Sequence, residues 1–187
     1  MVQSPVKTLT LEEFLILPDT KPASEYINGQ IIQKPMPKGA HSLIQTDLAA
    51  QINLAVKPKK IARVFTELRC HFAERAIVPD ISVFTWERIP RRENGRIADS
   101  FPLAPDWIIE ILSPGQSQTK VTQKMLNALE HGTEIGWLID PEAKAVIVYF
   151  QEGKIALFTE EGKPLPVPNF IENWHLTAPE IFDWLTV

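Results

Sequence analysis

The sequence predicts an α/β (α+β) fold in which helices pack on a central β-sheet. Three short apolar runs bounded by turn residues are typical of buried strands, and they lie within 77–84, 106–114 and 135–140. Two longer segments, from about 41 to 56 and from about 117 to 131, repeat apolar residues at helical spacing on one side. Such a one-sided stripe is typical of a helix that lies on a sheet.

The bulk properties indicate one domain, 1–187, because 187 residues can bury one substantial core. The net charge of −4 gives no general attraction for nucleic acid or anionic membranes, so any such contact must come from a local basic patch. The single cysteine, Cys70, excludes an internal disulfide. Without a long apolar run or a signal-peptide layout at the N-terminus, we expect a cytoplasmic protein and no membrane partner.

The N-terminal part predicts a short helix and a hairpin. Thr10–Glu13 fits a capping box that opens the helix, and Pro18 stops it. Two strands, 24–27 and 30–33, then flank Asn28–Gly29, a dipeptide that tolerates positive φ at both turn positions.

Two polar residues of this part are candidates for a site. Glu25 lies on the first hairpin strand, where a solvated side chain is the simpler interpretation. His41 opens the helix that runs to about Val56. A histidine there is more often a local hydrogen-bonding residue than a catalyst.

Two carboxylates interrupt strands that should be apolar. Asp80 lies in the predicted strand Ile77–Phe84, after Pro79, and it could instead satisfy turn N–H groups. Glu110 lies near the end of the strand in 106–114, where sheets covered by helices tend to build sites. A half-exposed Glu on an edge strand is the alternative, because a buried carboxylate is costly without a partner or a metal.

The segment from Trp86 to Ala104 is polar and predicts a long exposed loop. Its arginines form the strongest local basic patch of the chain. Two consecutive strands joined by this loop pair most simply as antiparallel neighbours, which would bring Asp80 beside Glu110.

Lys124 lies on the border of the apolar stripe of the helix 117–131, which Gly132 ends. Its ammonium could reach the strand ends, or the residue could be an ordinary surface lysine. Beyond the strand Ile135–Asp140 we expect a hairpin of 145–150 and 154–159 and a short C-terminal helix, 179–185.

Two carboxylates on adjacent strands can hold Mg²⁺ through hard oxygen ligands, and a lysine nearby can stabilise negative charge. Together these parts describe phosphodiester hydrolysis. The residues alone are a weak signal, because many proteins contain an Asp, a Glu and a Lys in this order.

Longer motifs make the signal more specific, and through them the chain resembles the Uma2 family (DUF820) of the PD-(D/E)XK nuclease superfamily, from about Thr10 to the C-terminus. The motifs are Glu25–Gly29, His41, Pro79–Asp80, Ile109–Pro114, Lys124 and Trp137–Pro141.

The resemblance implies a restriction-endonuclease-like core, a mixed central sheet flanked by helices. It also implies that Asp80 and Glu110 are metal ligands for Mg²⁺, with Mn²⁺ as a possible substitute, and that Lys124 is the catalytic lysine. Glu25 is implied as an accessory acid and His41 as a weaker candidate. DNA is the implied partner, and a homodimer is possible by analogy.

The chain departs from the family pattern at Lys120, where an acid is frequent, and at Ala128, where a tyrosine is frequent. Three functions therefore stand beside one another: a Mg²⁺-dependent DNA endonuclease, a nuclease fold kept as a non-catalytic module for nucleic acid or a partner protein, and a metal-dependent hydrolase of a smaller phosphoester.

Overall fold

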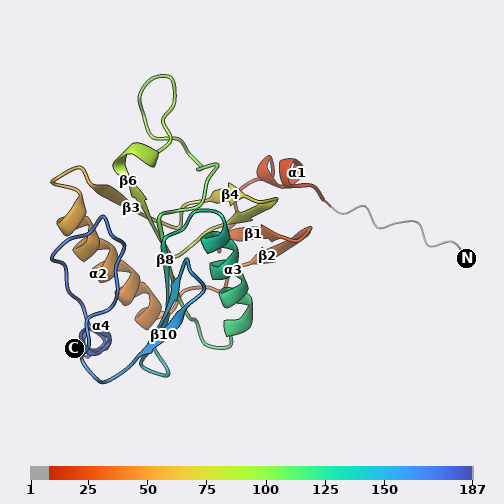
Figure 1. Ribbon diagram of the computed structural model, residues 1–187. Helices are drawn as coiled ribbons and strands as arrows, with labels where there is room; N and C mark the ends of the chain where they lie inside the picture. The colour runs from red at the N-terminus through yellow and green to blue at the C-terminus, as the bar shows by residue number, and fades with distance from the viewer. Residues whose placement is uncertain (1–8, 187) are drawn as a thin grey trace, which may run out of the picture.

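A computed structural model of the chain describes residues 9–186 (Figure 1). Residues 1–8, on which the expected absence of a signal peptide rests, and Val187 lie outside the described residues. The elements in chain order are α1 Leu11–Leu15, β1 Ser24–Ile27, β2 Gln30–Gln33, α2 Gly39–Val56, β3 Ala62–Thr66, β4 Cys70–Phe72, β5 Arg75–Ile77, β6 Ile81–Thr85, the 3₁₀ helix η1 Trp86–Arg88, β7 Trp107–Ile111, α3 Gln118–Glu130, β8 Ile135–Asp140, β9 Ala145–Phe150, β10 Ile155–Phe158 and α4 Ala178–Asp183.

The central sheet has six strands in the order β10-β9-β8-β7-β6-β3. Only β7 and β8 are parallel neighbours, and α3 connects them, as parallel pairing requires a crossover. The remaining pairs of this sheet are antiparallel. The expected mixed central sheet flanked by helices is therefore confirmed.

A second sheet of four strands, in the order β2-β1-β5-β4, was not expected. The predicted strand Ile77–Phe84 is wrong as a single strand, because its residues divide between β5 of the small sheet and β6 of the central sheet. Pro79 stands in the break and has no N–H to offer a ladder. Asp80 consequently lies at the bend before β6 and not within a strand.

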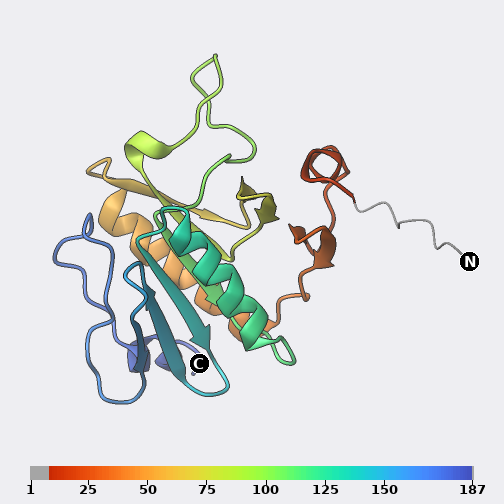
Figure 2. The same cartoon turned by 45° about the vertical axis from the view of Figure 1, so that its right-hand side comes forward.

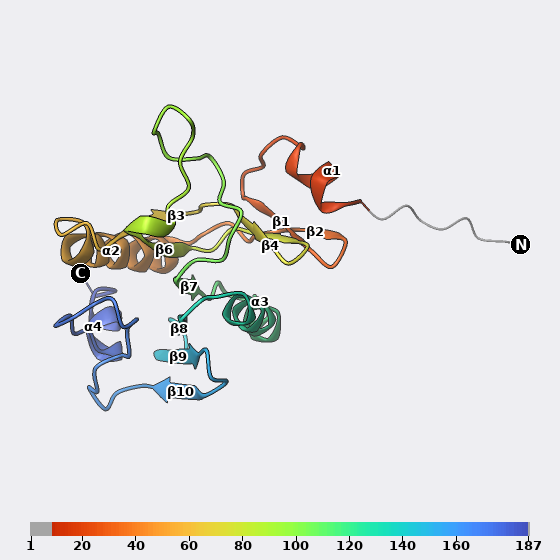
Figure 3. The same ribbon diagram turned by 45° about the horizontal axis from the view of Figure 1, so that its top comes forward.

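The helices cover opposite faces of the central sheet. Figure 3 shows α2 and α4 on one side of the strands, with α3 and the small sheet on the other. Alternation along β7 separates the two environments: Trp107, Ile109 and Ile111 belong to the core with α2 and α4, and Ile108 belongs to the core with α3. Glu110 is two residues after Ile108 on the strand, so its side chain points to the same face, toward α3.

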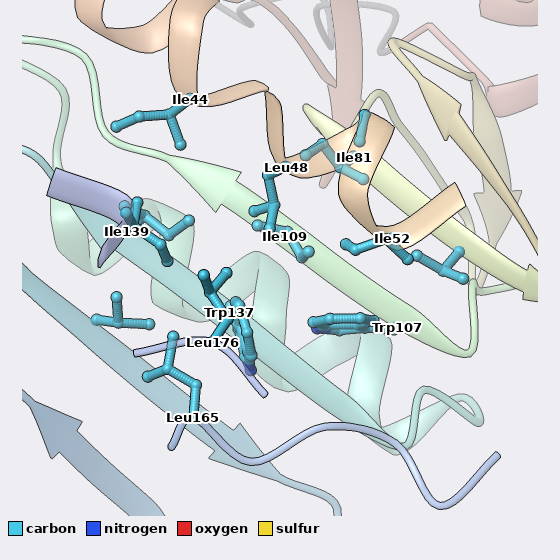
Figure 4. Packing of buried hydrophobic residues seen from close by; sticks show 14 of the residues in the cluster. Ile44, Leu48, Ile52, Ile81, Trp107, Ile109, Trp137, Ile139, Leu165 and Leu176 are labelled. Carbon is cyan, nitrogen blue, oxygen red and sulfur yellow. The ribbon is translucent and has the colours of Figure 1, made fainter. Parts of the chain in front are cut away.

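The core under α2 is built mainly from apolar side chains (Figure 4). Ile44, Leu48 and Ile52 of α2 have no exposed surface and lie over β6 and β7. Burying each such side chain stabilises the fold by roughly 1.5–3 kcal/mol. This layer fixes the positions of β6 and β7, whose adjoining ends carry the two carboxylates.

The local predictions for the N-terminal region are confirmed. Thr10 and Glu13 form the capping box of α1. Asn28 and Gly29 both take positive φ in the turn between β1 and β2. The second helix begins at Gly39, two residues earlier than expected, so His41 lies in its first turn.

The segment between β6 and β7 projects from the body of the protein (Figure 2). The sequence predicted a long exposed loop, but the segment is not exposed along its whole length. Ile89, Phe101 and Ala104 are buried. Phe101 packs edge-on against Phe84 with ring centroids 4.7 Å apart, which ties the loop to the sheet. None of the described helices is both long and apolar enough to cross a membrane.

Candidate active site

Asp80 and Glu110 come together through the pairing of β6 with β7. These strands are antiparallel and pair Ile81 with Ile109. Asp80, just before Ile81, therefore lies opposite Glu110, just after Ile109. Both carboxylate residues are only 1% exposed. The expected antiparallel pairing that brings Asp80 beside Glu110 is confirmed.

Asp80 is held by three donors from three different segments. Its Oδ1 accepts a hydrogen bond of 2.6 Å from Lys34 Nζ. Its Oδ2 accepts one of 2.7 Å from the Ile111 N–H, and His41 Nε2 lies 3.0 Å from the same oxygen. Both oxygens of this carboxylate are thus engaged within the protein.

Lys124 joins the other two acids of the cluster. Its Nζ lies 2.8 Å from Glu25 Oε1 and 2.7 Å from Glu110 Oε1. Glu25 Oε1 also accepts the Val78 N–H at 2.9 Å, so the hairpin strand β1 is tied to the segment that carries Asp80. The ammonium is buried, and the alternative of an ordinary surface lysine is wrong.

A close approach of α3 to the sheet lets Lys124 reach this position. Gly136 of β8 lies under α3, and a Cβ added there would come within 3.0 Å of Met125 Sδ and 3.3 Å of Ile108 Cγ2. The absence of a side chain at residue 136 therefore permits the helix to lie against the strand. Lys124, beside Met125, then extends its stem along the sheet to Glu110.

The two carboxylates differ in acidity. Burial would raise the pKa of Asp80, but Lys34 and His41 outweigh it and hold that pKa well below its usual range. Burial raises the pKa of Glu110 to about 7, against the attraction of Lys124 and with the help of the negative charge on Asp80. Glu110 is therefore the less well compensated carboxylate.

Both lysines of the cluster keep their charge. Burial alone would lower the pKa of Lys34, yet Asp80 and Glu110 raise it. The same balance raises the pKa of Lys124, with Glu110 and Glu25 as the opposing charges. The cluster is accordingly a set of buried ion pairs.

Lys34 and Gln45 were missed by the sequence analysis. Lys34 Nζ also donates to Val78 O at 2.7 Å and to Glu67 Oε1 at 3.4 Å. Gln45 Nε2 donates to the main-chain oxygen of Asp80 at 2.8 Å and to Glu67 Oε1 at 3.2 Å. Gln45 follows His41 by one helical turn, which was a usable signal, whereas Lys34 had only its place just after a hairpin strand.

A cavity of about 650 Å³ reaches the Asp80 side of the cluster. Its polar lining includes Lys34, His41, Gln45, Glu67, Asp80 and Gln116. Residues of the α1–β1 connection, such as Leu17 and Thr20, and Ser100 of the β6–β7 loop form its outer wall. Lys34 and Asp80 thus meet the cavity, whereas Glu110 and Lys124 are not among its lining residues.

The simpler interpretations of the other candidates are also corrected, except that of His41. Glu25 is 5% exposed, so it is not a solvated strand residue. His41 is 6% exposed and its Nε2 lies 3.0 Å from Asp80 Oδ2, which agrees with the simpler interpretation of a local hydrogen-bonding residue. Glu110 lies on β7, an interior strand between β6 and β8, and not on an edge. Asp80 accepts from the neighbouring strand and not from a turn N–H. All five candidates converge on one cluster, while their chemical roles stay predictions.

The arginines of the β6–β7 loop are partly neutralised. Arg88 pairs with Asp106, and Arg92 pairs with Asp99. Arg91 and Arg96 are exposed. The loop therefore offers a smaller positive surface than its composition suggested.

The two departures from the family pattern lie away from the ion pairs. Lys120 is exposed in the first turn of α3. Ala128 is fully buried in the apolar contact between α3 and the sheet. Neither residue contributes a polar group to the cluster in the part of the chain that the structure describes.

The donor set suits a divalent cation of the Mg²⁺ type. Among residues 9–186, no three His, Cys, Asp or Glu side chains are gathered as metal ligands. Mg²⁺ needs only one or two carboxylates, because it keeps several waters. Glu110 Oε1 is buried and lies 2.7 Å from Lys124 Nζ. A metal bound there would share this oxygen with the Lys124 ammonium.

The chain matches the Uma2 family, described as "Putative restriction endonuclease", over residues 11–179. It belongs to the Uma2 family. A crystal structure described as "a putative nuclease belonging to DUF820 from Anabaena variabilis ATCC 29413" shares 57% sequence identity with this Uma2 protein. The similarity has a TM-score of 0.92 and covers 94% of this chain and 98% of that one. No curated protein matches the chain.

Proposed function

We propose that this Uma2 protein is a metal-dependent endonuclease that hydrolyses phosphodiester bonds in DNA, with Mg²⁺ as its metal and Mn²⁺ as a substitute. The observation that carries the proposal is the meeting of the buried carboxylates Asp80 and Glu110 at the ends of neighbouring strands, with the Lys124 ammonium 2.7 Å from Glu110. The family description, "Putative restriction endonuclease", and the related crystal structure, described as "a putative nuclease", support it.

Asp80 and Glu110 would hold the metal, which when bound supplies Lewis-acid stabilisation of the phosphate and a more acidic water. Lys124 contributes a fixed positive charge beside the reacting phosphate, where negative charge develops. Glu25 holds that ammonium in place at 2.8 Å and acts as the accessory acid of the site.

His41 and Gln45 act as positioning residues in this proposal. His41 Nε2 lies 3.0 Å from Asp80 Oδ2, and Gln45 fixes the main-chain oxygen of the same residue at 2.8 Å. With the Ile111 N–H on Oδ2, they leave Oδ1 as the oxygen of Asp80 that can turn to a new ligand.

A non-catalytic nuclease-fold module is the second candidate, and one observation favours it. Each carboxylate of the pair already has a lysine within 2.7 Å, Lys34 for Asp80 and Lys124 for Glu110. A cluster that compensates its own charge does not require a metal for folding. Such a module would bind nucleic acid or a partner protein without hydrolysis.

Metal titration followed by a cleavage assay separates the two candidates. Calorimetry with Mn²⁺ and Mg²⁺ should show binding to wild type and none to Asp80→Ala or Glu110→Ala, while Glu130→Gln, an exposed carboxylate at the end of α3, should bind as wild type does. Supercoiled plasmid should then be nicked or linearised with metal and left intact in EDTA. A wild-type protein that binds metal beside DNA but leaves several plasmid and oligonucleotide substrates uncut would favour the module.

The same assay defines the role of Lys124. Lys124→Met should reduce cleavage by at least about 100-fold, as expected for loss of a fixed charge at the reacting group. Lys120→Met removes an exposed lysine from the same helix and serves as the matched control. Equal cleavage by the two variants would exclude Lys124 from the chemistry. A homodimer, expected by analogy, is tested by light scattering with and without DNA.

A further inference from the structure

We propose that the Lys34 ammonium occupies the place of the metal on Asp80, and that the metal enters by displacing this ammonium into the cavity. The inference rests on the metal site of the proposed function. It concerns a residue of this chain to which neither the family description nor the related structure assigns a role.

The oxygens around Lys34 form a cation site. Lys34 Nζ is bound by Asp80 Oδ1 at 2.6 Å, by Val78 O at 2.7 Å and by Glu67 Oε1 at 3.4 Å. Two carboxylates and a carbonyl are the hard oxygen donors that Mg²⁺ and related cations also use. The ammonium contributes the positive charge that a metal ion would otherwise supply.

Asp80 offers a metal its Oδ1 in preference to its Oδ2. Its Oδ2 is already engaged by the Ile111 N–H at 2.7 Å and by His41 Nε2 at 3.0 Å. Oδ1 is therefore the oxygen that can bind a metal, and it is the one that Lys34 holds. A divalent ion at about 2.1 Å from this oxygen would lie beside the ammonium, and two cations so close repel strongly.

The Lys34 side chain is flexible and lies next to the cavity, so it can move away from Asp80. It lies just after β2, in the connection to α2, and its side chain has four rotatable bonds on a flexible stem. Lys34 lines the cavity of about 650 Å³, together with Glu67, whose side chain is 44% exposed and can retain the ammonium. The displaced charge would remain in the space through which a phosphodiester reaches Asp80.

Lys124 is the internal contrast. It bridges two carboxylates from the middle of α3, and its side chain is 4% exposed against 8% for Lys34. Unlike Lys34, it is not among the residues that line the cavity. The inference therefore assigns the exchangeable cation to Lys34 and a fixed one to Lys124.

Mn²⁺ titration of the full-length protein, without DNA, tests the exchange. Lys34→Met should bind Mn²⁺ at least about tenfold more tightly than wild type, because a competing positive charge has been removed. Lys34→Gln, which keeps a donor for Asp80, should also bind more tightly and covers the case in which the methionine variant fails to fold. Lys34→Arg keeps the charge and should bind no more tightly than wild type.

Lys38→Met is the matched control, because Lys38 lies in the same connection but is exposed. Its affinity should stay within about twofold of wild type, since an exposed charge is screened. Affinity in both neutral Lys34 variants equal to or weaker than that of wild type would overturn the exchange.

The outcomes also distinguish this inference from the proposed function. Tighter Mn²⁺ binding by the neutral variants without DNA cleavage by wild type supports the exchange and rejects the nuclease. Binding in wild type that Asp80→Ala abolishes, with no gain in the Lys34 variants, keeps the metal site and rejects the exchange. Absence of Mn²⁺ binding in all proteins rejects both the exchange and the metal site.

Discussion

The cluster has two halves that contain the same groups but are built differently. The Asp80 half pairs its carboxylate with Lys34, which comes from a connection and faces the cavity. The Glu110 half pairs its carboxylate with Lys124, which comes from the middle of α3 and is enclosed by the sheet. The origin of each lysine decides whether its cation can be exchanged.

The two halves also differ in how well the charge of each carboxylate is compensated. Asp80 has a surplus of donors, from Lys34, His41 and a main-chain N–H, and its pKa is lowered. Glu110 shares Lys124 with Glu25, and burial raises its pKa to about 7. A divalent ion between the halves would add positive charge where Glu110 lacks it.

The largest expected effect comes from removing the enclosed lysine. Lys124→Met leaves Glu25 and Glu110 buried with no cation in contact, and loss of one partner of a buried pair costs about 3–5 kcal/mol. Urea denaturation of the metal-free protein measures this free energy of unfolding. Lys120→Met, exposed on the same helix, should change it by less than about 0.5 kcal/mol. Similar values for the two variants would contradict the enclosed character of the Glu110 half.

Removing the lysine of the Asp80 half should cost less. Lys34→Met leaves Asp80 with the Ile111 N–H and His41, and the cavity admits water, so we expect a loss of about 1–3 kcal/mol in the same denaturation experiment. Saturating Mn²⁺ should stabilise this variant more than it stabilises wild type. A cost as large as that of Lys124→Met would remove the distinction between the halves.

A third expected effect is a change in the pH dependence of stability. The pKa of Glu110 is raised to about 7 in the folded protein, above its unfolded value of 4.5, so between these values the folded state binds more protons. Its contribution therefore lowers the free energy of unfolding as pH rises through this window. Glu110→Gln in EDTA should lose that contribution, by at most about 1.4 kcal/mol per pH unit.

Denaturation at several pH values between 5 and 8 checks this sign. The difference in stability between Glu110→Gln and wild type should shift in favour of the variant as pH rises. Glu130→Gln, an exposed carboxylate, should follow wild type across the range. If the free energy of unfolding of Glu110→Gln instead falls relative to wild type as pH rises, Glu110 is stabilised as a carboxylate, as Asp80 is.

Local sequence patterns correctly predicted the features that depend only on neighbouring residues. The capping box of Thr10 and Glu13, the turn at Asn28 and Gly29 and the apolar stripe of α2 all follow from neighbouring residues. The long motifs around Asp80, Glu110 and Lys124 pointed to Uma2 and to the central sheet, and that assignment is confirmed.

Sequence patterns failed where the decision lies between distant segments. The segment from Ile77 to Phe84 is interrupted at Pro79 and Asp80, but residue types alone do not tell that its two ends join different sheets. Periodicity likewise could not distinguish an exposed Lys124 from a buried one, since the residue lies at the border of its stripe and its partners Glu25 and Glu110 come from other segments.

The sequence by itself determined most of the elements, the order of the chemical groups and the family, because capping, turn preference, hydrophobic period and sequence motifs depend on adjacent residues. The tertiary structure alone decided which charge meets which. Lys34 lies 46 residues before Asp80 and Glu25 lies 99 before Lys124, yet each pair is in contact at 2.6 and 2.8 Å. Coulomb interactions and burial depend on distance in space, so no local pattern could reveal that a lysine from a connection lies against Asp80 Oδ1.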